Sequence, residues 1–208
     1  MARLSESLRN NFDGDFLGFI GEASLGSPLH QDNPYAFKIY AFKHALAAGY
    51  TQILWLDSSC FAIKNVQPIF DIIESEGYIM QEAGQYVGNW ANDKTLDYFK
   101  LTRDTAMEML CYGNAGFLGL NFEDEIAETF FYQWEKAMNA GMFKGAWNNT
   151  DNSESEDERC KGHRHDLVCG SIIANQLGMR YKPGNEWLQY AGMFDETANE
   201  TIVIKAQG

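Results

Sequence analysis

One short apolar run constrains the fold of this chain more than any other feature. Residues 53–56 are Ile-Leu-Trp-Leu, and Asp57 and two serines follow them directly. An unbroken apolar run of this length, bounded by polar residues, is typical of a strand that is buried on both faces in a parallel sheet. Such sheets bind their ligands at the carboxyl ends of the strands. The sequence therefore predicts that Asp57 lies at a binding edge.

Helix and strand patterns alternate along the rest of the chain. We expect helices over residues 3–12, 34–48, 66–75, 93–99, 104–110, 123–140 and 166–177. We expect strands over residues 15–20, 52–56, 78–81, 115–120, 180–182 and 201–205, with a short strand or turn at 61–64 and an aromatic segment at 187–190. Residues 82–92, rich in Gly, Asn and aromatic residues, suit a ligand-facing loop and an ordinary surface turn equally. The alternation predicts an α/β fold with a mostly parallel mixed sheet flanked by helices.

Length, charge and composition limit the class of protein. The 208 residues, 45% of them hydrophobic, suffice for a single domain over residues 1–208 with a sizeable core. A formal charge of -13 disfavours binding to nucleic-acid phosphates and to anionic membranes. The chain has neither an apolar run long enough to span a membrane nor a secretory signal pattern, so we expect a soluble cytoplasmic protein. In a reducing compartment its four cysteines are expected to be buried thiols. A mobile acidic loop is expected at about residues 148–160, where apolar residues are almost absent.

The first candidate site is Asp57 with the hydroxyl residues Ser58 and Ser59 that follow it. A carboxylate at a strand end, followed by small hydroxyl residues, can bind a hard divalent cation directly and through water. Diphosphate oxygens would then complete the coordination of the cation. The alternative is that Asp57 caps the next turn through backbone N–H groups, and the residues alone support both readings.

The second candidate site is the sequence His163-Arg164-His165-Asp166. Two imidazoles, a guanidinium and a carboxylate are costly to bury together, so such a cluster usually faces a ligand. Arg164 could neutralise a phosphate, and Asp166 could orient a sugar hydroxyl. One alternative is a solvated loop in which Asp166 is the N-cap of the following helix. Another is a zinc site that also uses the two nearby cysteines, although the spacing matches no familiar ligand pattern.

Two further features point towards the same ligand. Lys38 lies between Phe37 and Ile39 in an apolar stretch, so its ammonium must reach solvent or meet an anion such as Asp57 or a phosphate. Asn114 and Gly116 precede an apolar strand, where a ligand could approach the backbone closely. Tight helix packing would explain the same glycine.

Four segments, taken together, resemble the nucleotide-diphospho-sugar transferases of GT-A type. They are Pro34-Tyr35-Ala36-Phe37-Lys38, Ile53-Leu54-Trp55-Leu56-Asp57-Ser58-Ser59, Asn114-Ala115-Gly116-Phe117-Leu118-Gly119-Leu120-Asn121 and His163-Arg164-His165-Asp166. The similarity lies in their order and spacing and extends over roughly residues 12–178. It implies a GT-A-like fold without the family's first strand, because the chain begins at what looks like the helix that follows that strand.

The resemblance also implies an activity: a metal-assisted transfer of a sugar from a nucleotide-diphosphate donor to a glycan or another hydroxyl acceptor, with Mn²⁺ or Mg²⁺ as cofactor. Ser59 stands where the family motif has its second acidic residue. The resemblance assigns the metal to Asp57 with His165 or His163, donor binding to Lys38, Asp57, Ser59, Arg164 and Gly116, and the reacting face to Asp166 and Asn114.

Two other functions fit the same residues. A domain without activity could bind a sugar or a partner protein, and the serine at position 59 and the absent first strand favour this alternative. Aromatic residues at positions 86, 90, 147, 187 and 190 would suit a sugar-binding surface, or equally the face of a homo-oligomer. A metal-dependent phosphoester hydrolase that uses Asp57 and the histidines is the third alternative.

Overall fold

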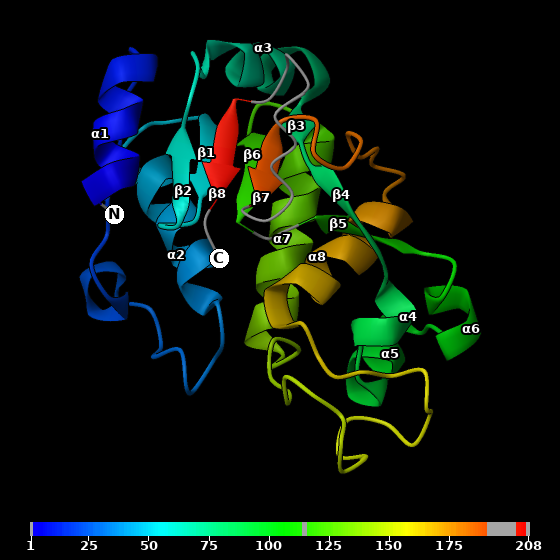
Figure 1. Ribbon diagram of the computed structural model, residues 1–208. Helices are drawn as coiled ribbons and strands as arrows, with labels where there is room; N and C mark the ends of the chain where they lie inside the picture. Colours follow the sequence, from blue (N-terminus) through cyan, green and yellow to red (C-terminus); the bar gives the residue numbers. More distant parts are fainter. Residues whose placement is uncertain (1, 114–115, 191–202, 207–208) are drawn as a thin grey trace.

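The protein is described by a computed structural model that covers residues 2–113, 116–190 and 203–206 (Figure 1). Its helices are α1 (Ala2–Asn11), η1 (Glu22–Leu25), α2 (Ala36–Ala47), α3 (Gln67–Glu76), α4 (Val87–Trp90), α5 (Asp93–Phe99), α6 (Arg103–Ala106), α7 (Glu125–Asn139) and α8 (His165–Gln176). Its strands are β1 (Gln52–Leu56), β2 (Cys60–Ala62), β3 (Tyr78–Ile79), β4 (Gln81–Tyr86), β5 (Leu110–Gly113), β6 (Phe117–Asn121), β7 (Leu188–Tyr190) and β8 (Ile204–Ala206). Within the described ranges, no helix has the length and apolar character needed to cross a bilayer.

The central sheet has the strand order β1-β6-β3, and β6 is antiparallel to both of its neighbours. The prediction of a mostly parallel sheet is therefore wrong. The mixed α/β character is confirmed, because helices and strands both occur along the chain. Strands β7 and β8 pair in parallel in a separate sheet. The helical connection through α3 does give β1 and β3 the same direction, as the alternating pattern requires. However, β6 returns from a distant part of the chain and inserts between them. Periodicity within each segment holds no information about that insertion.

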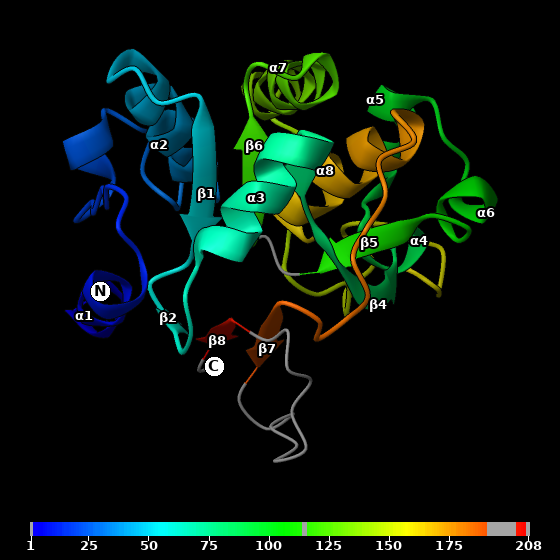
Figure 2. The same ribbon diagram turned by 90° about the horizontal axis from the view of Figure 1, so that it is seen from above.

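Helices cover both faces of the central sheet (Figures 1 and 2). The alternation of side chains along β1 explains how two cores form. Ile53 and Trp55 pack on the core that α2, α7 and α8 share, and Leu54 and Leu56 pack on the core of α1, α3 and the β2-β8-β7 sheet. A third cluster joins α4 to β5 and α8. All four cysteines are buried free thiols, as predicted.

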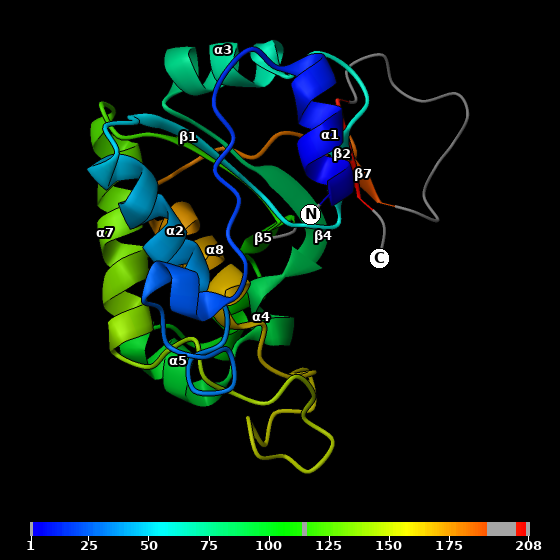
Figure 3. The ribbon, with the colours of Figure 1, turned by 90° about the vertical axis from the view of Figure 1, so that its left-hand side faces the viewer.

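Several predicted elements differ in the structure. Residues 15–20, expected as a strand, form no regular element and pass across β1 (Figure 3). The expected loop at 82–92 instead contains most of β4 and the whole of α4, and β5 begins where a helix was expected to end. The strands β4 and β5 pair with each other, and a partner outside its own segment is not visible in a local pattern.

The start of α2 also differs from its prediction. Asn33 does not cap the helix, which begins at Ala36 after Tyr35 has taken up a left-handed conformation with φ 58°. The backbone carbonyl of Asn33, and not its side chain, accepts the amide of Ala36 at 3.2 Å. The helix expected to start at residue 34 therefore starts two residues later.

Candidate active site

Asp57 lies directly after β1, where the sequence placed it. Its Oδ1 accepts a hydrogen bond from Trp55 Nε1 at 2.8 Å, because residues two apart on a strand point to the same face. The turn that follows is closed by the backbone carbonyl of Asp57, which accepts the amide of Cys60 at 2.8 Å. The carboxylate is thus held by an indole and is 41% exposed, which makes it available to a ligand.

Gly116 lies against the same carboxylate. The Asp57 amide donates to the Gly116 carbonyl at 3.0 Å, and a Cβ added at Gly116 would lie 2.7 Å from Asp57 Oδ2. Any side chain at position 116 would therefore displace the carboxylate. The close approach that the sequence suggested for this glycine is to Asp57. Asn114, its predicted companion, lies outside the described residues.

A buried ammonium connects Asp57 to the start of α8. Lys38 on α2 is only 2% exposed, and its Nζ lies 2.8 Å from Asp166 Oδ2 and 3.9 Å from Asp57 Oδ1. The same Nζ lies 5.0 Å from the centre of the Tyr35 ring. Three residues that are far apart in the sequence, and were each predicted as site residues, therefore meet in one charged network.

Asp166 is held at this network by α8 and α7. It is 2% exposed, and its backbone carbonyl accepts a hydrogen bond from Trp134 Nε1 at 2.9 Å. Helix α8 begins at His165, and its N-cap Arg164 forms no side-chain cap. The alternative reading of a solvated loop capped by Asp166 is therefore wrong.

The two histidines occupy different environments. His163 is fully buried, with Nε2 2.8 Å from the Met142 carbonyl and Nδ1 accepting the Asn92 amide at 3.4 Å, so both of its ring nitrogens are engaged. His165 Nδ1 lies 2.8 Å from the Phe143 carbonyl. A metal at this turn would have access to His165 only through its other nitrogen. His163 has no ring nitrogen left for a metal in this arrangement.

Aromatic rings enclose the guanidinium of Arg164. Its central carbon lies 3.6 Å from the Trp147 ring centre and 3.9 Å from that of Trp90, and Nη1 donates to the Trp147 carbonyl at 2.7 Å. Trp147 also stacks on His165, with ring centres 5.7 Å apart, and Tyr35 approaches His165 at 5.5 Å. These rings form an aromatic wall beside the charged network.

The electrostatics of the network follow from burial and pairing. Burial would lower the pKa of Lys38, but the carboxylates of Asp166 and Asp57 outweigh it and raise that pKa, so the ammonium is charged. Burial raises the pKa of Asp166, and the Lys38 ammonium opposes this rise. Burial, followed by the charge of Asp166, also raises the pKa of Tyr35. Burial lowers the pKa of His163 to about 3, so this imidazole is neutral.

The side chains fit one kind of cation site and not another. Within the described ranges, no three His, Cys, Asp or Glu side chains are grouped around a common position for a metal, which leaves the zinc alternative without support. Mg²⁺, in contrast, is commonly bound by one or two carboxylates together with substrate phosphates and water. Asp57, exposed and at the rim of a cavity, fits that second arrangement.

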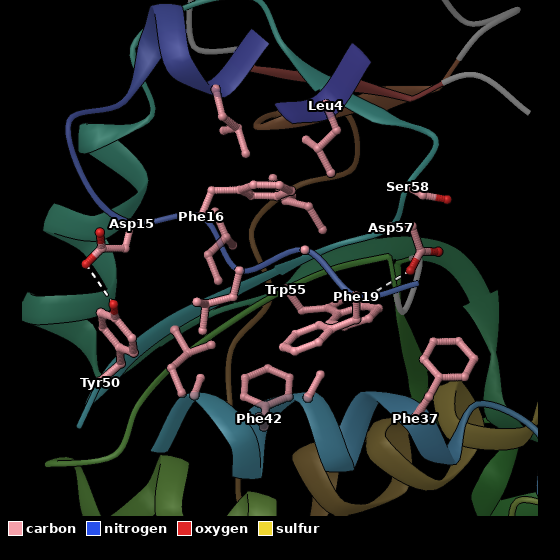
Figure 4. A pocket seen from close by; sticks show the side chains of 18 of the residues that line it. Leu4, Asp15, Phe16, Phe19, Phe37, Phe42, Tyr50, Trp55, Asp57 and Ser58 are labelled. Carbon is pink, nitrogen blue, oxygen red and sulfur yellow. Dashed lines mark hydrogen bonds between the residues drawn. The ribbon is translucent and has the colours of Figure 1, made fainter. Parts of the chain in front are cut away.

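The cavity lies along β1, between side chains of α2 and side chains of α1 (Figure 4). Its volume is about 530 Å³. Asp57, Ser58 and Ser59 line one end, and Asp15 and Tyr50, joined by a 2.8 Å hydrogen bond, line the other. The part between them is apolar. Ser59 thus belongs to the cavity wall, and its carbonyl accepts a hydrogen bond from Arg3.

Sequence reasoning assigned no role at this site to Tyr35 and Trp55, and named Trp147 only as an aromatic residue that would suit a sugar-binding surface. Trp55 could have been identified, since its position two residues before Asp57 places both side chains on one face of the strand. Tyr35 and His165 share a further feature: both are left-handed non-glycine residues, with φ of 58° and 47°. Such conformations cost about 1–3 kcal/mol each and cluster at functional sites.

Comparisons with known proteins add little to this geometry. No protein-family model and no curated protein matches the chain. A solved structure of the bifunctional glycosyltransferase WbbM in its apo form aligns with a TM-score of 0.47 and 12% identity, over 83% of this chain and 31% of that one. The apo form of mouse xyloside xylosyltransferase 1 aligns with a TM-score of 0.38 and 13% identity, over 82% of this chain and 64% of that one. The chain thus spans less than two thirds of either neighbour, and TM-scores below 0.5 carry no argument about its fold or activity.

Proposed function

We propose that this chain is a glycosyltransferase-like domain that binds the diphosphate of a nucleotide sugar beside Asp57 and transfers the sugar to a hydroxyl acceptor. The observation that carries the proposal is the meeting of Asp57, Lys38 and Asp166 in one network at the end of β1. Asp166 lies more than a hundred positions from the other two residues in the sequence. The resemblance assigns Lys38 and Asp57 to donor binding and Asp166 to the reacting face.

Charge balance supports a cation as part of this proposal. The formal charges of Asp57 and Asp166 cancel those of Lys38 and Arg164, so the site offers no net positive charge to a diphosphate. A divalent cation on Asp57 would supply it, and would offset the charge that develops on the departing diphosphate. Mn²⁺ or Mg²⁺ dependence is therefore part of the proposal, with Asp57 as the protein ligand and His165 Nε2 as the remaining imidazole candidate.

The residues of the chain have separate roles in this scheme. Lys38 keeps the two carboxylates at a fixed separation and limits their repulsion of a phosphate. Arg164, held between two tryptophans, presents its remaining N–H groups to an anion. Asp166 is 2% exposed and paired, so we assign to it the positioning of Lys38. Asp166 therefore does not have the role at the reacting face that the resemblance implied.

Calorimetric titration with UDP and UDP-sugars, with and without Mn²⁺, tests the proposal. We expect measurable binding that needs the cation and that falls at least tenfold in Asp57→Asn. The matched control is Asp97→Asn, an exposed aspartate on α5, which should bind as the unaltered protein does. Cation-independent binding, or equal binding by the two variants, would contradict the scheme.

A binding domain without turnover is the second candidate function. It is favoured by the exposed Trp147, 54% accessible beside Arg164, which suits stacking on a sugar ring. The two candidates differ in one measurement. A transferase releases nucleotide from a UDP-sugar when a hydroxyl acceptor is supplied, whereas a binding domain retains it intact.

A further inference from the structure

The strand β1 has one edge without a partner. Among the described residues β1 pairs with β6 alone. The amide of Asp57 donates to Gly116 and that of Phe122 donates to Thr51, so the odd-numbered residues of β1 direct their backbone groups towards β6. The N–H and C=O groups of residues 52, 54 and 56 therefore point to the opposite edge. No described residue forms a hydrogen bond to them there.

The cavity lies along this free edge and has the surroundings of a buried central strand. Side chains of α2 line one of its faces, and side chains of α1 and α3 line the other (Figure 4). They are Phe37, Ala41, Phe42 and Ala45 on the first face, and Leu4, Leu8, Val66 and Phe70 on the second. Phe42 and the four residues of the second face belong to the two cores that pack on opposite faces of β1.

The far side of the cavity is formed by residues 15–20. This segment has no regular secondary structure, passes across β1 in Figure 3 and makes no backbone hydrogen bond to any described residue. Its apolar side chains are incompletely covered, with Phe16 and Leu17 39% exposed and Ile20 84% exposed. Its sequence nevertheless predicts a strand. The β1 side of the cavity thus offers strand backbone that has no partner among the described residues.

We propose that this cavity is a slot for one extended β-strand of a partner polypeptide, which would pair with β1 by β-augmentation. A five-residue strand is about 17 Å long and matches the length of β1. Apolar side chains on both of its faces would contact the two cores. Asp15, Glu22 and Asp57 line the slot, so basic residues at the two ends of the strand would complement its charge.

The free backbone groups distinguish a strand from a small apolar ligand. A hydrocarbon chain would fill the volume but leave the N–H and C=O groups of residues 52, 54 and 56 unpaired and cut off from water. A peptide backbone satisfies them. The proposed occupant is therefore defined by its backbone hydrogen bonds as well as by its apolar side chains.

Two synthetic peptides test the proposal. Each has five alternating valine and isoleucine residues flanked by two lysines at both ends, and the second is N-methylated at the five apolar amides. We expect the first peptide to bind and to slow amide hydrogen exchange at Gln52, Leu54 and Leu56 at least tenfold. The N-methylated peptide should bind at least tenfold more weakly. Absence of binding, or equal binding of both peptides, would overturn the proposal.

Two variants at one position provide the matched control in the protein. Leu54→Pro removes an N–H group directed at the slot and leaves the β1–β6 hydrogen bonds in place, whereas Leu54→Ala removes the side chain and keeps that N–H group. We expect Leu54→Pro to bind the first peptide several-fold more weakly than Leu54→Ala does. If Leu54→Pro fails to fold, the two peptides still decide the question with the unaltered protein. A homodimer that the first peptide dissociates would assign the slot to a second copy of the chain and overturn the proposal.

Discussion

Replacing Lys38 by methionine tests whether the charged network is as buried as the structure indicates. Methionine keeps most of the apolar stem and removes the ammonium that lies 2.8 Å from Asp166. The side chains of this pair are 2% and 3% exposed, so the variant leaves a carboxylate buried without its counter-charge. Removing one partner of a buried ion pair costs about 3–5 kcal/mol. We expect Lys38→Met to lower the free energy of unfolding by that amount at pH 7.

The same helix provides the control for this prediction. Lys43 also pairs with a carboxylate, Glu135, at 2.6 Å, but its side chain is 53% exposed. Exposed pairs contribute about 0–1 kcal/mol, so Lys43→Met should have little effect. Urea denaturation, followed by far-ultraviolet circular dichroism, measures both variants. If Lys38→Met costs no more than Lys43→Met, the reasoning about burial is refuted.

The pH dependence of the Lys38→Met deficit gives an independent check. Without its counter-charge, Asp166 has a folded-state pKa above its unfolded value, so the folded protein binds the proton more tightly. This contribution stabilises the variant below the unfolded pKa and is lost as the pH rises through the folded pKa. The difference from the unaltered protein should therefore shrink from pH 7 to pH 4. A double variant with Asp166→Asn should recover part of the loss at pH 7.

Three further predictions concern stability. The free energy of unfolding should fall as the pH drops from about 6.5 towards 3, and His163 should contribute at most about 5 kcal/mol to this fall. The unfolded imidazole takes up a proton in this interval, whereas the buried imidazole, with its pKa of about 3, does not. In His163→Gln, the free energy of unfolding measured by denaturation should depend less on pH over the same interval. Asp124→Ala should cost about 1 kcal/mol in urea denaturation, because Asp124 Oδ1 accepts two amides of the first turn of α7, and Glu125→Ala should cost less. Gly119→Ala should cost about 1–3 kcal/mol, because the new Cβ would overlap Ile73 Cδ1, and adding Ile73→Val should reduce the loss in melting experiments.

The sequence predicted those parts of the fold that depend on local patterns. The helix expected over residues 123–140 is α7 at Glu125–Asn139, because an acidic first turn and one apolar face define it without help from the rest of the chain. The helix expected over 66–75 is likewise α3. The direction of β6 and the existence of β5 depend on distant partners, so no local pattern contained them.

The candidate site shows the same division. Asp57, Lys38 and Asp166 were each identified because their chemistry is unusual for their surroundings, and such conflicts are visible in a sequence. Asp57 was also named as an anion that Lys38 could meet, but the contact of Lys38 with Asp166 was not predicted, because it depends on how α2 and α8 pack together. The predicted partner of Asp57 was an imidazole across a cation, whereas the structure joins Asp57 to that turn through the Lys38 ammonium. The burial of His163 was missed, since a histidine beside an arginine normally indicates an exposed segment.

The two proposals concern one strand and are therefore physically linked. Asp57 follows β1 directly, and its amide donates a hydrogen bond to the Gly116 carbonyl. Ordering residues 52–56 by a partner on their free edge would also restrict the carboxylate that follows them. A basic residue at the end of the bound strand would also pair with Asp57, the carboxylate assigned to the cation, so peptide and nucleotide should bind with negative cooperativity. The coupling must be reciprocal if it exists, because linkage requires each ligand to change the affinity of the other by the same factor.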